Sequence, residues 1–312
     1  MKKKLILLLF ILALLIAVDL TQFSTNTQIL ALLIPLFRLP RLIILLAAGI
    51  ALSLAGLIIQ TITDNPLADS STIGITSGAS AGTVIFFLIA SHFSLSGLWN
   101  FSYPIFAIVG AILAFAMIYV FALRKNVSNV RVLLTGIAVT SFFQSIITIA
   151  QLSVNQFDFQ QVAVWLSGDV WQTDSSYITL VLILLLLGLM VFPFFIKQLE
   201  LLSLGEELAL SLGLNVKRVK IQLYLLALYY AVIGVLVIGG LAFVGLIAPH
   251  IARELGGFKL KKRIPFAVLS GMIILVFANI VSQLIIAPSS LPLGFVVAFI
   301  GAPYYIYLIQ KI

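Results

Sequence analysis

Cysteine is absent from this sequence, and charge is scarce. The lack of cysteine excludes disulfide bonds and thiolate metal ligands. Charged residues make up only 9% of the 312 residues and hydrophobic residues make up 62%, whereas soluble domains average about 25% and about 45–50%. A soluble fold of this length could not bury so much apolar surface, so the lipid bilayer must solvate most of the chain.

Three further absences narrow the possible activities. No P-loop motif is present, so the chain is not expected to hydrolyse ATP itself. No carboxylate falls in the middle of an apolar run, where ion-coupled transporters usually keep one. The two histidines, His92 and His250, have no partner at metal-ligand spacing other than Glu254, so neither a metal site nor an acid–base cluster is predicted. A stand-alone secondary transporter or channel and a membrane enzyme are therefore disfavoured.

Long, unbroken apolar runs are the main feature that is present. They lack the alternation of a transmembrane β-barrel and predict an all-α membrane protein with a single transmembrane domain over residues 1–312. The first run resembles a signal peptide, but no small-residue cleavage site follows it, so we expect a retained first helix, with a cleaved signal as the alternative. About ten spans are predicted, at residues 5–20, 41–63, 72–91, 101–123, 131–152, 175–196, 218–239, 243–255, 265–287 and 293–310.

Basic residues predict the orientation of these spans. Lys and Arg gather at the amino terminus and in every second loop, which should therefore be cytoplasmic, together with both termini. The same pattern accounts for the net charge of +8 without nucleic-acid binding. Arg38 and Arg41 are exceptions, because they precede the second span on the outer side. The outer segment 153–174 contains Trp165 and is expected to lie flat at the interface or to dip back into the membrane.

The inside segment from Glu200 to Val216 is predicted to form a short amphipathic helical hairpin between the sixth and seventh spans. Ser203 followed by Glu206 fits a capping box, and Gly213 is placed to end the helix. The pattern alone leaves two interpretations open. The hairpin is either a surface helix on lipid headgroups or a docking element for a cytoplasmic partner.

An ordered series of short motifs covers nearly the whole chain. Taken together, these motifs closely resemble the FecCD family of ABC importer permeases, which carry ferric siderophores, haem or cobalamin. The segments that carry the resemblance are Arg38–Arg41, Asn65–Asp69, Gly74–Ala79, Leu134–Ala138, Trp165–Gly168, Leu204–Gly213, Phe243–Arg253, Leu291–Gly294 and Gly301–Pro303.

The resemblance implies a mechanism in which this chain is one part of a larger machine. Two permease subunits, identical or paralogous, would sit in the bacterial cytoplasmic membrane on a dimer of ATP-binding subunits, which hold ATP and magnesium. This chain would carry no cofactor. An extracytoplasmic substrate-binding protein would deliver the cargo. An iron–siderophore complex is the expected cargo because it is common in the family, with haem or cobalamin as alternatives.

The resemblance also assigns four groups of residues. They dock the ATPase, dock the binding protein, form a cytoplasmic gate and line a translocation path. In that order they are Leu204, Glu206, Glu207, Leu208, Leu210, Ser211 and Leu212; Arg38 and Arg41; Asn65, Leu67, Ser128 and Asn129; and Ser141, Gln144, Ser145 and Thr148.

The residues themselves allow other roles for two of these groups. The path residues recur at i, i+3, i+4 and i+7, which puts them on one face of a helix, where they would suit hydrogen bonds between helices as well as a water-filled path. Arg38 and Arg41 would also suit snorkelling anchors of the second span. Gln283 stands where the family's cobalamin importer has a third docking arginine, and an amide there could only donate or accept a hydrogen bond.

Overall fold

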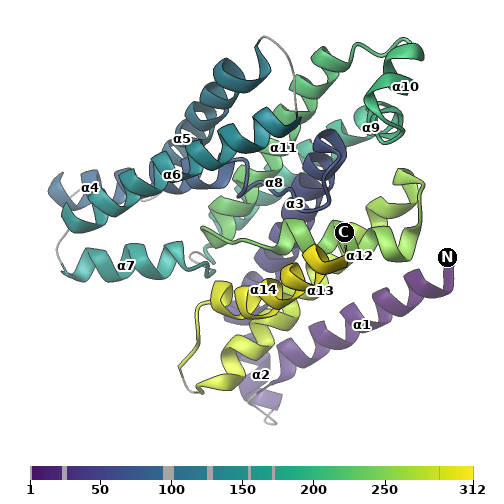
Figure 1. Cartoon of the computed structure of the whole chain (residues 1–312). Coiled ribbons are helices and arrows are strands. Elements are labelled where there is room, and N and C mark those ends of the chain that lie inside the picture. Colours follow the sequence, from purple (N-terminus) through teal and green to yellow (C-terminus); the bar gives the residue numbers. More distant parts are fainter. Residues whose placement is uncertain are drawn as a thin grey trace.

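The computed structural model describes residues 2–22, 27–93, 102–124, 129–153, 156–170, 173–287 and 289–311, and this described part is helical without strands (Figure 1). The all-α prediction is therefore confirmed. The elements are α1 (Lys2–Thr21), α2 (Thr27–Leu33), η1 (Ile34–Arg38), α3 (Leu39–Thr63), α4 (Ile75–Phe93), α5 (Tyr103–Ile118), η3 (Tyr119–Leu123), α6 (Asn129–Ser153), α7 (Gln156–Leu166), α8 (Ser175–Val191), η4 (Phe192–Phe195), α9 (Ile196–Leu202), α10 (Glu206–Ser211), α11 (Val216–Ile238), α12 (Val244–Gly256), α13 (Leu260–Ile285) and α14 (Leu293–Lys311).

Each of the ten predicted spans coincides with a helix or with a continuous run of helices. Among the described residues, 8 helices are long and apolar enough to cross a membrane. The other two predicted spans correspond to α4, whose apolar part is shorter, and to α12, which has 13 residues. The multi-pass architecture is thus clear, and the number of complete crossings stays a prediction.

The helix that contains α3 lies at the centre of the bundle, and α1 lies at its edge (Figure 1). In their most apolar stretches, 83% of the residues of Leu30–Thr63 are buried, against 11% of those of α1. Small residues allow α3 to approach its neighbours closely. A Cβ atom at Gly56 would overlap the backbone of Gly245 in α12, and one at Gly49 would meet the backbone of α13 at Met272.

The second span begins earlier than predicted. A continuous helix runs from Leu30 to Thr63, so Arg38 and Arg41 lie within it and not in a preceding segment. Prolines normally disrupt helices because they lack the backbone N–H. Here Pro35 falls in the π-helical turn η1 and Pro40 at the start of α3, where the altered turn accommodates them.

The outer segment that holds Trp165 dips into the protein. The Trp165 side chain is fully buried and packs edge-on against Phe87, which fits the second of the two predicted arrangements, a segment that dips back, and not a segment lying flat at the interface. The Gly168 carbonyl accepts a 2.8 Å hydrogen bond from the Gly294 N–H at the start of α14. A Cβ atom at Gly239, just after α11, would collide with the Trp165 carbonyl. The end of α7 therefore meets the ends of two spans.

The hairpin between α8 and α11 forms as predicted, with one correction. Ser203 does not cap α10, because its hydroxyl donates to the Glu200 carbonyl at 2.7 Å and closes α9 instead. Gly205, at φ 106°, turns the chain between the two helices and moves the start of α10 to Glu206. Gly213 has φ 83° and follows the end of α10, as expected.

Candidate functional sites at the two ends of the bundle

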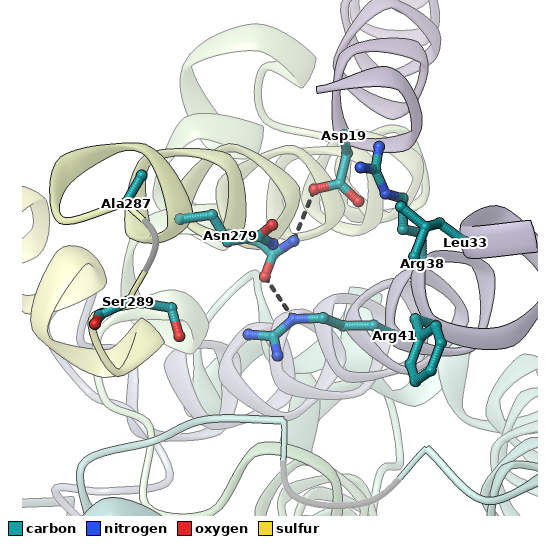
Figure 2. A pocket seen from close by; sticks show the side chains of 10 residues that line it. Asp19, Leu33, Arg38, Arg41, Asn279, Ala287 and Ser289 are labelled. Carbon is teal, nitrogen blue, oxygen red and sulfur yellow. Dashed lines mark hydrogen bonds between the residues drawn. The ribbon is translucent and has the colours of Figure 1, made fainter. Parts of the chain in front are cut away.

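A pocket of about 700 Å³, with several polar side chains in its wall, opens at the end of the bundle where α1 ends and α3 begins (Figure 2). Side chains from α1, α2, η1, α3 and α13 line it, together with the segment between α13 and α14. The lining residues are Asp19, Leu33, Phe37, Arg38, Arg41, Asn279, Gln283, Ala287, Ser289 and Ser290.

Arg41 forms the centre of a hydrogen-bonded network beside this pocket. Its Nη2 lies 2.8 Å from Asp169 Oδ1, and its Nε donates to Asn279 Oδ1 at 2.8 Å. Asn279 is fully buried and extends the network to α1, because its Nδ2 donates to Asp19 Oδ1 at 2.7 Å. Figure 2 shows Asn279 between Asp19 and Arg41, with both of its bonds dashed. Buried polar groups thus pair with one another as expected within a membrane.

Arg38 and the residue at the third predicted docking position are also bonded within the chain. Arg38 donates to the Leu20 and Gln22 carbonyls, at 2.6 Å each, and so ties the end of α1 to η1. The Gln22 side chain donates to Gln283 Oε1 at 2.7 Å. The two arginines expected to face a partner therefore already have partners in this chain.

Sequence reasoning missed Asp19, Asn279 and Asp169. A signal for the first two was present, because both are polar residues near the ends of long apolar runs. Asp169 carries no such signal, and only the folded path of the chain after α7 brings it to Arg41.

The loop between α3 and α4 enters the bundle. Asn65 Oδ1 accepts the Leu67 N–H at 2.9 Å, and Leu67 packs with Leu246 and Leu308 of α12 and α14. Of these two predicted gate residues, Leu67 therefore packs against the bundle, and Asn65 bonds within the loop. A second pocket, of about 340 Å³, has Asn65 and the hairpin residue Leu204 in its wall, so the loop and the hairpin adjoin the same hollow.

Asp69 of the same loop carries a buried carboxylate, whose burial no local sequence pattern indicates. Its Oδ1 and the carbonyl of Leu52, in the middle of α3, both border Gly245. The carboxylate accepts from the Ser70 N–H at 2.6 Å and from the Ser71 hydroxyl at 3.2 Å. No apolar run carries this carboxylate, because a loop residue, rather than a span residue, brings it to the level of the middle of α3.

The other two predicted gate residues belong to the segment before α6. Asn129 begins α6, and its Oδ1 accepts a hydrogen bond from Lys220 at 2.8 Å. Ser128 lies outside the described residues.

The hairpin presents leucines to its surroundings. Leu204, Leu208, Leu210 and Leu212 are each 56–61% exposed, and Glu207 and Ser211 are exposed beside them. Glu206 differs from the rest of this group, because its carboxylate forms an ion pair with Lys220 at 2.5 Å.

The four predicted path residues share an exposed face of α6. Ser141, Ser145 and Thr148 each donate to a carbonyl one turn earlier in the same helix, at 2.9–3.0 Å. These three hydroxyls are therefore satisfied within α6 itself, and the face remains exposed. Among the described residues, no group of three His, Cys, Asp or Glu side chains could hold a metal ion.

These features define a multi-pass, all-helical membrane protein with an arginine-containing pocket at one end and a leucine-rich hairpin at the other. The FecCD transport family model matches residues 5–311. The chain is 38% identical over 277 residues to the iron(3+)-hydroxamate import system permease protein FhuG of Bacillus subtilis, covering 88% of this chain and 82% of that protein. It is 35% identical over 298 residues to the iron-uptake system permease protein FeuC of the same organism, covering 93% and 87%.

The fold is shared with a solved transporter as well. That structure, of a transporter assigned to the metal-chelate ABC type in an inward-facing conformation, is 24% identical and covers 100% of this chain and 99% of its own, with a TM-score of 0.87. The chain belongs to the FecCD transport family, and it is a multi-pass permease of the cell membrane.

Proposed function

We propose that this chain is the membrane-spanning subunit of an ABC importer that carries a ferric siderophore complex inward. Its relatives in Bacillus subtilis are named for iron(3+)-hydroxamate import and iron uptake, and they match over most of their length. A separate ATPase dimer on the cytoplasmic side supplies the energy, and a binding protein outside supplies the cargo. A second permease subunit completes the path. Both termini of this chain face the cytoplasm.

The hairpin is the observation that carries the ATPase assignment. Two of its exposed leucines, Leu208 and Leu210, lie on α10, and Leu204 and Leu212 flank it. With only 6 residues, α10 is too short to span a membrane. Single exposed apolar residues are ordinary, but a cluster of them on a protruding element marks an interaction surface. Glu207 adds a charge at the edge of this surface, where it would set the register of a partner.

The outer pocket is the proposed docking site for the binding protein. Arg38 and Arg41 border it, with Ser289 and Ser290 opposite. Because Asp19 and Asp169 offset the two positive charges, an acidic partner would have to compete for Arg41 with groups of this chain. The docking interface is therefore expected to be weak and sensitive to salt.

The α6 stripe is the proposed wall of the translocation path. Its polar groups are small and uncharged, as suits a large chelate that must pass without being held. Haem and cobalamin importers of the same fold remain the alternative functions. A titration of the cognate binding protein separates them, because a ferric hydroxamate should quench its tryptophan fluorescence saturably, whereas haem and cobalamin should show no saturable binding.

Co-purification tests the ATPase assignment against a stand-alone transporter. A tagged chain should bring an ATP-binding subunit out of detergent-solubilised membranes. Glu207→Lys combined with Leu208→Asp should remove that subunit while leaving the amount of inserted permease unchanged. Lys259→Glu, an exposed charge change in another inside loop, is the control and should behave as the wild type. A wild-type chain that brings down no ATPase would contradict the proposal.

A further inference from the structure

One lysine is buried at the cytoplasmic end of α11, between the hairpin and the start of α6. Lys220 is 1% exposed and ranks among the largest fully buried side chains of the described residues. Its Nζ donates to Glu206 Oε1 of α10 at 2.5 Å and to Asn129 Oδ1 of α6 at 2.8 Å. A single ammonium group thus joins the proposed ATPase-docking element to a proposed gate residue.

A buried ammonium group is a costly way to hold two helices together. Lysine is almost never fully buried without a partner, and an apolar side chain of the same volume would pack there without a desolvation cost. An ammonium group can instead fix the relative position of two helices, because it donates hydrogen bonds to an acceptor on each of them at once. Removing either acceptor would leave a buried charge with an incomplete set of partners.

The neighbouring Lys217 strengthens the same link. Its Nζ donates to the Arg124 carbonyl at 2.9 Å, at the end of the helix run that precedes α6. The first turns of α11 therefore hold both ends of the segment between Arg124 and Asn129. Lys217 is exposed and carries no ion pair to the hairpin. Of the two, only Lys220 therefore reaches α10.

The helix α10 of the hairpin makes few buried contacts with the rest of the chain. In α10 only Ala209 is buried, and positive-φ glycines lie at both of its ends. Small displacements at such glycine-flanked junctions meet little backbone resistance. A displacement of α10 would therefore be transmitted to the spans through its few inward contacts. The Glu206–Lys220 ion pair is the charged contact among them.

We propose that Lys220 is the positioning residue that transmits displacement of the docking hairpin to the start of α6, and so to the cytoplasmic gate. The inference rests on the proposed function, because it takes the hairpin to be the ATPase contact. It separates two neighbouring glutamates that look alike in the sequence. Glu207 is exposed and free to dock, whereas Glu206, whose side chain is 39% exposed, pairs with buried Lys220 and serves transmission.

The absence of native cysteine permits a direct test. Val130→Cys places a reporter next to Asn129, at a position that is 66% exposed. In the complex isolated with its ATPase, labelling of this cysteine by a membrane-impermeant maleimide should change when ATP is added. Lys220→Met, which keeps the length of the side chain and removes its charge, should lower that ATP-dependent change about fivefold or more while the ATPase still co-purifies. Arg218→Met removes an exposed charge from the same helical turn and should leave the change intact.

Each result decides the matter. An undiminished ATP-dependent change in Lys220→Met would overturn the proposal, and so would loss of the ATPase from that complex, because Lys220 would then serve assembly alone. If Lys220→Met does not accumulate in the membrane, the double variant with Glu206→Leu removes both charges and leaves none unpaired. The same criteria apply to it. A wild-type complex without any ATPase would instead refute the proposed function, so the two failures are distinct.

Discussion

Arg41 makes two charge-assisted contacts within the chain, one to Asp169 and one to Asn279. Its side chain is 24% exposed and that of Asp169 is 21% exposed, so the pair is neither a free surface pair nor a sealed one. Such half-buried pairs contribute modestly to stability, but they decide where a guanidinium group points. Asp169 is therefore placed to act as an internal competitor for an incoming carboxylate.

Neutralising that competitor should strengthen docking. In Asp169→Asn the guanidinium of Arg41 loses its internal counter-charge, so we expect the binding protein to associate about two- to fivefold more tightly at low salt. Surface plasmon resonance with the permease in nanodiscs measures the change. Asp174→Asn is the matched control, because it removes an acidic group from the same outer connection and asparagine still caps α8. Weaker binding by Asp169→Asn would show that the pair supports the docking surface instead of competing with it.

At the scale of single elements, α6 has two dissimilar faces. Residues such as Val139, Phe143 and Ile147 are buried against the bundle, while the polar stripe and several large apolar side chains are exposed. The three hydroxyls of the stripe satisfy their donors within the helix, so the amide of Gln144 is the group of the stripe that would be unfavourable against lipid. The stripe therefore calls for water or for a second subunit beside it.

Single cysteines distinguish the surroundings of α6. Ser145→Cys should react with a small water-soluble maleimide in the assembled transporter, because the stripe is proposed to face the path. Ile112→Cys, on the exposed side of α5 at 52% exposure, should react at least about tenfold more slowly, because it is expected to face hydrocarbon, from which water and the charged reagent are excluded. Mass spectrometry of the labelled chain gives both rates. Equal, slow reaction at the two positions would assign the stripe to a dry contact.

The elements differ in how well the sequence predicts them, and the reason is physical. Apolar runs such as that of α11 locate a helix to within a few residues, because burial in lipid depends on local composition. The extension of the second span past Pro35 was missed, since it depends on a π-helical turn. The burial of Asp69 and Lys220 was missed because it depends on chain segments distant in sequence, which no local pattern encodes.

For the whole molecule, the central helix that contains α3 links the two functional ends. Arg38 and Arg41 lie near its start beside the larger pocket, and Asn65 follows its end beside the smaller one. The close glycine contacts of α3 with α12 and α13 favour movement of these helices together, because packed backbones have little freedom to slide separately. An importer built this way would open one end as it closes the other.

The proposed transport mechanism requires the hairpin end of the bundle to face the cytoplasm, and this orientation can be measured on the whole molecule. Two single cysteines report on the two ends, one from each segment that flanks α13. Ser289→Cys lies at the larger pocket, and Phe258→Cys replaces a side chain that is 90% exposed in the wall of the smaller pocket. If basic loops face the cytoplasm, a membrane-impermeant maleimide should label Ser289→Cys in intact cells and Phe258→Cys only after permeabilisation. The opposite pattern would place the hairpin outside, where no ATP-driven subunit could reach it, and the transport mechanism proposed for this chain would fail at its first step.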